Sequence, residues 1–220
     1  MYGINNAYHI VQVLSPINST GAKAGDIVCM KVYGHADVII NVGVSGGTQT
    51  VEFDRVNSVS SSGATTLEFT DYYVSGGKIF VTNWNGVAWS DDELVTGAAL
   101  SASLESFAGN YMTVFDMTTG VVAAETITGG TSGATAIAVN ANEYEDVLVK
   151  RIAASNTFTM AAVSDVMYVV PIAATMLGDG YDCFQCDLGA QGSGVLAGIT
   201  VILFKARFAS GDTPISSIYD

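Results

Sequence analysis

The stretch TITGGTSGATAIAV, residues 126–139, decides how the chain is interpreted, because its glycines suit either a phosphate-binding loop or a tight turn. A phosphate-binding loop of the G-x-x-x-x-G-K-[ST] type has a lysine after its glycines and opens a helix. No lysine follows these glycines, and the next segment, ATAIAVN, alternates and is suited to a strand. Glycine supplies the positive φ of a tight turn, and threonine suits the flanking strands. The stretch therefore predicts a β-hairpin.

Alternation of apolar and polar residues extends this prediction along most of the chain. Clusters of Gly, Ser, Asn and Asp separate the alternating runs, and we interpret VSGGK (74–78) as one of these turns. Short strands at such spacing are typical of a β-sandwich or jelly roll. We therefore expect an all-β fold of antiparallel sheets. The expected strands lie at 9–14, 26–33, 37–44, 49–56, 65–74, 78–84, 110–117, 120–128, 134–140, 145–153, 156–162, 166–173, 181–188 and 198–208.

One segment carries a helix signal. Ser90 and Glu93 stand at the spacing of a capping box, and Asp91 and Asp92 suit the positive end of a helix. Gly97 and the serines beyond it favour a helix less. We expect at most one or two short helical turns, near 90–97, and no long amphipathic helix.

The charge content argues against two classes of partner. Charged residues make up 13% of the chain, against about 25% in a typical protein, and 21 acids against 8 bases give a net charge of −13. Nucleic-acid binding needs clustered Lys and Arg, but the bases here are scattered. The longest apolar stretch near a terminus, 197–208, is too short to span a bilayer and contains Lys205 and Arg207. We predict neither a nucleic-acid partner nor a membrane partner.

Residues with catalytic or metal-binding chemistry are few. Cys183 and Cys186 form a C-x-x-C, but a zinc site needs two further ligands, and only Cys29, His9 and His35 are available. We interpret the C-x-x-C as two small residues on a strand and the histidines as structural, and free thiols suggest a reducing cytoplasm. The sequence predicts no enzyme, no catalytic residue, no cofactor and no metal ligand.

Two acidic loops leave an alternative open. SDDE (90–93) and NEYED (142–146) are rich in carboxylates, which calcium prefers as ligands. Neither follows the EF-hand spacing, so we favour solvated acidic loops and keep calcium as the alternative.

Aromatic and terminal residues form the candidate interaction surface. Trp84 and Trp89 lie close together in NWNGVAW, which suits a small sugar-binding surface, an anchored loop, or an interface with a neighbouring subunit. The termini, 1–8 and 210–220, lack a core pattern and are candidate extended arms that order on a partner. The surface residues are Trp84, Trp89, Tyr2, Ile4, Ile218 and Tyr219.

The order of several segments resembles a family of small structural proteins of tailed bacteriophages. HIVQVLSPINSTGAKAGDIVCMKVYGHADVIINVGV (9–44) is similar to that family's VVQVL-P strand, Gly-rich turn and GD-V-MK-Y segment. TLEFTDYYV (66–74) is similar to its K-A-L-x-F strand, with Thr65 and Thr66 where Lys and Ala are common. The segment 168–211 resembles its closing D-C and A-R-Y strands, with Phe208 where Tyr is usual. The match covers about two thirds of the chain, and 84–160 matches least.

The resemblance implies a capsid decoration or cement protein, made in the host cytoplasm and found on the capsid surface of the virion. Its implied partners are the major capsid protein and further copies of itself, as a dimer or trimer. The alternatives are a tail, neck or fibre-attachment component, and a receptor- or glycan-binding module. We expect residues 1–220 to form a single β-rich domain, in which 84–160 is an elaboration or a second β subdomain.

Overall fold

The computed structural model of the chain describes residues 8–57, 63–119, 121–139, 144–153, 155–190, 194–206 and 218–219. The chain divides into two compact units: unit 1 comprises Met1–Tyr72 and Arg151–Asp220, and unit 2 comprises Tyr73–Lys150. In sequence, unit 2 therefore interrupts unit 1. Unit 2 overlaps the elaboration expected at 84–160, but begins and ends earlier in the chain.

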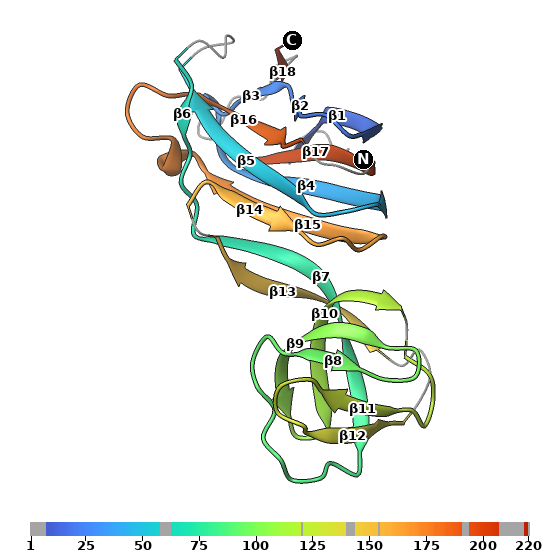
Figure 1. The fold of residues 1–220 in the computed structure, drawn as a ribbon. Coiled ribbons are helices and arrows are strands. Elements are labelled where there is room, and N and C mark those ends of the chain that lie inside the picture. Colours follow the sequence, from blue (N-terminus) through green and yellow to red (C-terminus); the bar gives the residue numbers. More distant parts are fainter. Residues whose placement is uncertain are drawn as a thin grey trace, which may run out of the picture. The chain divides into compact units, whose positions relative to one another are not determined.

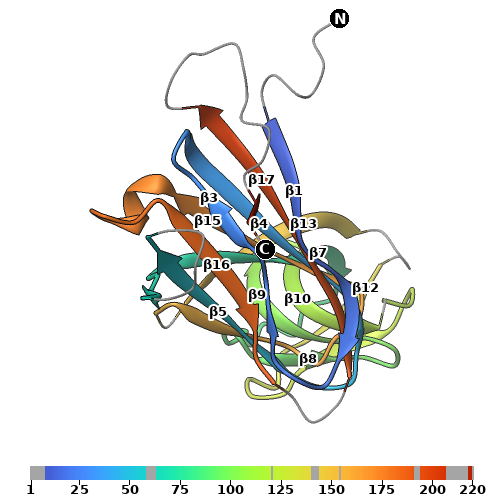
Figure 2. The same ribbon diagram turned by 90° about the horizontal axis from the view of Figure 1, so that it is seen from above.

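Unit 1 consists of antiparallel sheets packed against each other, which confirms the expected all-β class. One sheet contains β1, β17, β4 and β15 in that order, and the other contains β14, β5, β16, β3 and β18, with β2 beside β16 and β6 beside β5 (Figures 1 and 2). The bounds are β1 Tyr8–Ser19, β2 Lys23–Ala24, β3 Ile27–Cys29, β4 Tyr33–Ser45, β5 Gln49–Val56, β6 Thr65–Thr66, β14 Thr157–Met160, β15 Val166–Ala173, β16 Cys183–Leu188, β17 Val195–Ala206 and β18 Ile218–Tyr219.

The core of unit 1 follows from alternation in its strands. In β4, Ala36, Val38, Ile40 and Val42 are buried, and every second residue of β17 opposite them is buried too. Because cross-strand neighbours point to the same face of a sheet, these side chains form one apolar layer. Aromatic rings of the second sheet complete the core, including Phe53 and Phe184, whose centroids lie 6.5 Å apart.

The strand expected at 26–33 is broken in the structure. β3 ends at Cys29 and β4 begins at Tyr33, in the other sheet. The Met30 N–H donates to the Asp182 carbonyl at 2.7 Å, and the Tyr33 N–H donates to the Met30 carbonyl at 3.0 Å. This turn carries the chain from one sheet to the other, which alternation alone does not reveal.

Unit 2 contains a closed barrel of six strands (Figure 1). The strand order is β7-β10-β9-β8-β11-β12, and β12 pairs back onto β7, where Ala138 lies opposite Val81. Its interior is a single apolar cluster built mainly from Val, Leu, Ile, Met and Ala. The bounds are β7 Asp71–Thr82, β8 Leu94–Thr96, β9 Ser101–Ala108, β10 Tyr111–Thr119, β11 Thr126–Gly129 and β12 Thr135–Ala138, with β13, Tyr144–Ile152, beside β7.

The hairpin expected at 126–139 is confirmed. β11 and β12 pair antiparallel, with Thr126 opposite Ile137 and Thr128 opposite Thr135. Gly133 has φ of 67°, a left-handed conformation that glycine adopts without steric cost.

The prediction of helical turns near 90–97 is wrong. Asp91 and Asp92 form a turn, in which Asp92 has φ of 59°, and residues 94–96 are strand β8. A short 3-10 helix, η2, occurs instead at Ala174–Leu177. The Glu93 side chain does accept the Ser90 N–H at 2.8 Å, as in a capping box, but its other partners lie in a distant hairpin.

The turn expected at VSGGK is also wrong, because β7 runs unbroken through Gly76 and Gly77. These glycines lie opposite Phe115 and Val114 of β10. A Cβ on Gly76 would collide with the Val114 carbonyl, a backbone atom that cannot move aside. Gly76 therefore permits a close approach of strands rather than a change of direction.

We predict that Gly76→Ala destabilises the protein by about 1–3 kcal/mol, because the added methyl group forces β7 and β10 apart. Urea unfolding followed by circular dichroism measures the change. The control is Gly21→Ala, since nothing lies within 4 Å of that position, and it should change stability by less than about 0.5 kcal/mol. Equal effects of the two variants would contradict the role given to Gly76.

Candidate functional site

The glycine-rich turn of unit 2 binds a carboxylate that belongs to the chain itself. Glu93 is 4% exposed. Its Oε2 accepts the Thr131 and Ser132 N–H groups at 3.1 and 2.9 Å, and its Oε1 accepts the Ser132 hydroxyl at 2.8 Å. The backbone of the turn therefore does cradle an anion, but the anion is an internal side chain.

A second buried carboxylate repeats the arrangement. Glu125 is 6% exposed. Its Oε1 accepts the Val122 N–H at 2.7 Å, and its Oε2 accepts the Ala99 and Leu100 N–H groups at 2.9 and 3.4 Å. Each glutamate thus fixes the turn that follows the other glutamate in the barrel.

The two glutamates open similar short motifs that were not expected from the sequence. ELVTG (93–97) and ETITG (125–129) share the pattern E-x-[VI]-T-G, and Thr96 lies opposite Thr128 in the pairing of β8 with β11. The residues before the two glutamates, Asp92 and Ala124, have φ of 59° and 60°. The two motifs therefore have the same local arrangement on either side of the Thr96–Thr128 pair.

The glycine of each motif makes room for the carboxylate of the other. A Cβ on Gly97 would collide with the Glu125 carboxylate, and one on Gly129 would collide with that of Glu93. Both copies of the motif are visible in the sequence. The distance between them, however, does not match a repeat type that has a fixed period.

Hydrogen bonding keeps both glutamates ionised. Burial alone would raise their pKa values, but backbone N–H groups outweigh it and lower the pKa of each below the ordinary value of 4.5. Because all of these donors belong to the protein, we interpret the pair as structural clamps that join the two hairpins.

We predict that unit 2 loses stability in acid. Since both folded-state pKa values are lowered, the ionised clamps stabilise the fold fully above the ordinary value of 4.5, and this stabilisation is lost as the pH falls through the folded-state values. Glu93→Gln replaces an acceptor oxygen with an amide donor and should cost about 1.5–3 kcal/mol at neutral pH.

Urea unfolding between neutral pH and about pH 3 tests this prediction, with the double variant Glu93→Gln/Glu125→Gln showing a weaker dependence on pH than the unaltered protein. Asp91→Asn, at an exposed neighbour, is the control and should behave like the unaltered protein. An undiminished acid dependence in the double variant would contradict the clamps.

The acidic loops do not form a calcium site among the described residues, where no group of three or more Asp, Glu, His or Cys side chains could hold a metal ion. Asp91 and Asp92 are exposed as expected, but Glu93 is buried, so the expectation of a fully solvated loop is wrong there. Residues 142 and 143 lie outside the described residues, and the side chains of 144–146 are not described.

The cysteines of the C-x-x-C lie on a strand, as expected, and point to opposite faces of β16 because they are three residues apart. Cys183 instead faces Cys29 of β3, directly across the sheet. A hydrogen bond from the Cys183 thiol lowers the pKa of Cys29, whereas that bond and burial raise the pKa of Cys183. This pair could not be predicted from the sequence, because its members are far apart in the chain.

Both histidines contact aromatic rings of unit 1. Nδ1 of His9 lies 2.9 Å from the Tyr33 hydroxyl oxygen, and the His35 ring stacks on Phe204 at 5.7 Å between centroids. These contacts support the structural role expected for the two residues.

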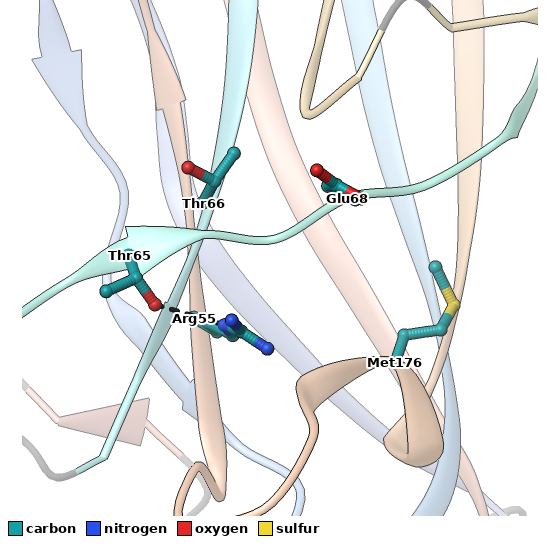
Figure 3. Close-up of a pocket in the computed structure, with 5 residues that line it drawn as sticks. All are labelled: Arg55, Thr65, Thr66, Glu68 and Met176. Carbon is teal, nitrogen blue, oxygen red and sulfur yellow. Dashed lines mark hydrogen bonds between the residues drawn. The ribbon is translucent and has the colours of Figure 1, made fainter.

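A cavity of about 450 Å³ opens between β5, β6 and η2, lined by Arg55, Thr65, Thr66, Glu68 and Met176 (Figure 3). Arg55 donates from Nε to the Thr65 hydroxyl and from Nη1 to the Leu177 carbonyl, both at 3.0 Å. Its guanidinium also lies 4.7 Å from the centroid of the Tyr181 ring. The arginine is thus used to join these segments, and we assign the cavity no ligand.

The tryptophans are only partly available for binding. Trp84 is 47% exposed, and its indole N–H donates to the Val87 carbonyl at 2.7 Å. Trp89 is half-buried, and its Nε1 is buried with no hydrogen-bond partner among the described residues. Both rings contact Phe107, with centroids 5.4 and 5.8 Å away, so they form an anchored cluster with one exposed member.

The terminal residues of the candidate surface are not brought beside the tryptophans by any described contact. Tyr2 and Ile4 lie outside the described residues. Ile218 and Tyr219 form β18, paired with Val28 and Ile27 of β3, so these two residues extend the chain's own sheet.

Unit 1 also carries an apolar surface that was not predicted from the sequence, the outer face of the sheet β1-β17-β4-β15. Tyr8 and Ile10 of β1 are 50% and 56% exposed, and they lie opposite Phe204 and Ile202 of β17, which are partly exposed. Cross-strand register continues this face through β4 and β15. The outer face comprises Tyr8, Ile10, Gln12, Gly198, Thr200, Ile202, Phe204, His35, Asp37, Ile39, Asn41, Met167, Val169, Pro171 and Ala173.

Comparison with models of known protein families, with curated proteins and with solved structures finds no match for this chain. Within the described residues, no helix has the length and apolar character needed to cross a membrane.

Proposed function

We propose that this protein is a non-enzymatic virion component, a capsid decoration protein that binds and stabilises a shell of major capsid proteins. The observation that carries the proposal is the outer face of unit 1, which contains one acid, Asp37, and no Lys or Arg among the residues named above. Exposed apolar surfaces of this kind mark sites of protein association. The sequence resemblance to phage structural proteins supports the choice of partner.

The strand β1 favours a particular mode of binding. It is the last strand of its sheet among the described strands, so one row of its backbone groups is open to pairing. Its second half is protected, because the register shifts at Leu14 and Ile17 and Pro16 interrupt regular pairing. Its first half, Tyr8–Gln12, is regular and presents two exposed apolar side chains.

We therefore expect a strand of the capsid protein to add to β1 at Tyr8–Gln12 while apolar side chains cover Tyr8 and Ile10. Each contact is small, but a shell presents many copies, and a ligand that binds only the assembled shell stabilises it by mass action. The net charge of −13 disfavours competing binding to nucleic acid.

We predict that the protein binds decoration-free capsids of its phage until a fixed number of copies per capsid is reached. The bound protein should raise the temperature at which the capsids disrupt. Ile10→Asp should weaken this binding about tenfold or more, because it places a charge in the apolar contact. Co-sedimentation and differential scanning fluorimetry measure the two effects.

Leu148→Asp is the matched control, since Leu148 is 51% exposed and belongs to unit 2. It should bind like the unaltered protein. Absence of both binding and capsid stabilisation would overturn the proposal, as would equal loss in the two variants.

A tail, neck or fibre-attachment role is the alternative location. Copy number in purified virions separates it from decoration, because a shell protein is present in hundreds of copies and a neck or tail protein in a few. Homo-oligomers are also expected, as dimers or trimers, and analytical ultracentrifugation measures them.

A further inference from the structure

Cys29 and Cys183 are direct neighbours across β3 and β16, although they are far apart in sequence. The Met30 N–H donates to the Asp182 carbonyl at 2.7 Å, so the next pair along the ladder is hydrogen-bonded. Because hydrogen-bonded and non-hydrogen-bonded pairs alternate in antiparallel sheets, the two cysteines occupy a non-hydrogen-bonded position, where Cα atoms are about 4.5 Å apart. A disulfide needs a Cα separation of about 4.4–6.8 Å.

The surroundings give the two thiols different roles. Cys29 is partly exposed and can meet a reagent from solvent, whereas Cys183 is 3% exposed and packs with Ile27 and Val56. Two charges act on the pair: Lys31 favours the Cys29 thiolate, and Asp182 opposes it. Cys186 is fully buried on the opposite face of β16, so it cannot reach either thiol.

We propose that Cys29 and Cys183 form a reversible dithiol–disulfide site, oxidised by small-molecule disulfides such as oxidised glutathione. The Cys29 thiolate attacks one sulfur of the reagent, forming a mixed disulfide and releasing one glutathione thiolate. Cys183 then gives up its proton and attacks the Cys29 sulfur, which releases the second glutathione. The net change is that two cysteine thiols are oxidised to one disulfide and one reagent disulfide is reduced to two thiols.

The bond would join β3 covalently to β16 within unit 1 and close a loop of about 150 residues, which restricts the unfolded chain. The site would stay reduced in a cytoplasm and oxidise once the protein reaches an oxidising environment. This inference does not depend on capsid binding, so either proposal can fail without the other.

The test uses the full chain, reduced and then exposed to glutathione mixtures of increasing oxidised fraction. The samples are quenched in acid, alkylated with iodoacetamide after denaturation, and digested for mass spectrometry. We expect a linked peptide pair containing Cys29 and Cys183, reversed by reducing agent, with Cys186 alkylated throughout. Three alkylated cysteines at the highest oxidised fraction, or glutathione retained on Cys29 without a link, would overturn the proposal.

Variants separate the attacking thiol from its neighbour. Cys183→Ser keeps a hydrogen-bond donor beside Cys29 and Cys183→Ala removes it, so iodoacetamide should modify Cys29 several-fold more slowly at pH 7 in the alanine variant. The unaltered chain and Cys186→Ala, in which the pair is intact, should both form the link. Equal rates in the serine and alanine variants would show that Cys183 does not activate Cys29.

Discussion

The packing of apolar side chains on the sheet β1-β17-β4-β15 is the constraint on which unit 1 depends. Val38 and Ile40 of β4 lie beside Val201 and Ile199 of β17, and all four are buried. The second sheet covers this inner face, whereas the outer face carries exposed Tyr8 and Ile10. A chain with 13% charged residues has few ionic groups to solvate such a face. The low charge content and the exposed outer face both support the proposal that unit 1 associates with other protein.

Unit 2 depends on a different interaction, the hydrogen bonds that two buried carboxylates accept from backbone N–H groups. Its barrel closes where β12 pairs with β7, and its hairpin turns leave backbone N–H groups without sheet partners. Glu93 and Glu125 supply the missing acceptors from inside the fold. The ELVTG and ETITG motifs use their carboxylates reciprocally, since each glutamate accepts hydrogen bonds from the turn that follows the other.

Much of the fold could be predicted from alternation, because a period of two is a local property of the sequence. The hairpin at 126–139 is an example. The prediction failed where a distant neighbour decided the outcome. Gly76 was predicted to lie in a turn, but it lies within a strand, where the nearby Val114 carbonyl leaves no room for a side chain. Ser90 and Glu93 looked like a helix start, but Glu93 is held by the hairpin that contains Ser132.

The candidate sites were harder to predict for the same reason. Cys29 and Cys183 pair because of the register between β3 and β16, which come from the first and second sequence segments of unit 1. The outer face requires knowledge of which strands are neighbours and which face the second sheet covers. By contrast, Trp84 stands out in the sequence, and it is indeed about half exposed, while Trp89 is half-buried.

Hydrogen–deuterium exchange of the protein, free and bound to decoration-free capsids, tests the central claim most directly. If the outer face of unit 1 is the docking surface, backbone amides in Tyr8–Gln12 of β1 exchange more slowly on the capsid, and those of β8 in unit 2 exchange at an unchanged rate. Unchanged exchange in β1 with capsid bound, or new protection confined to unit 2, would contradict it.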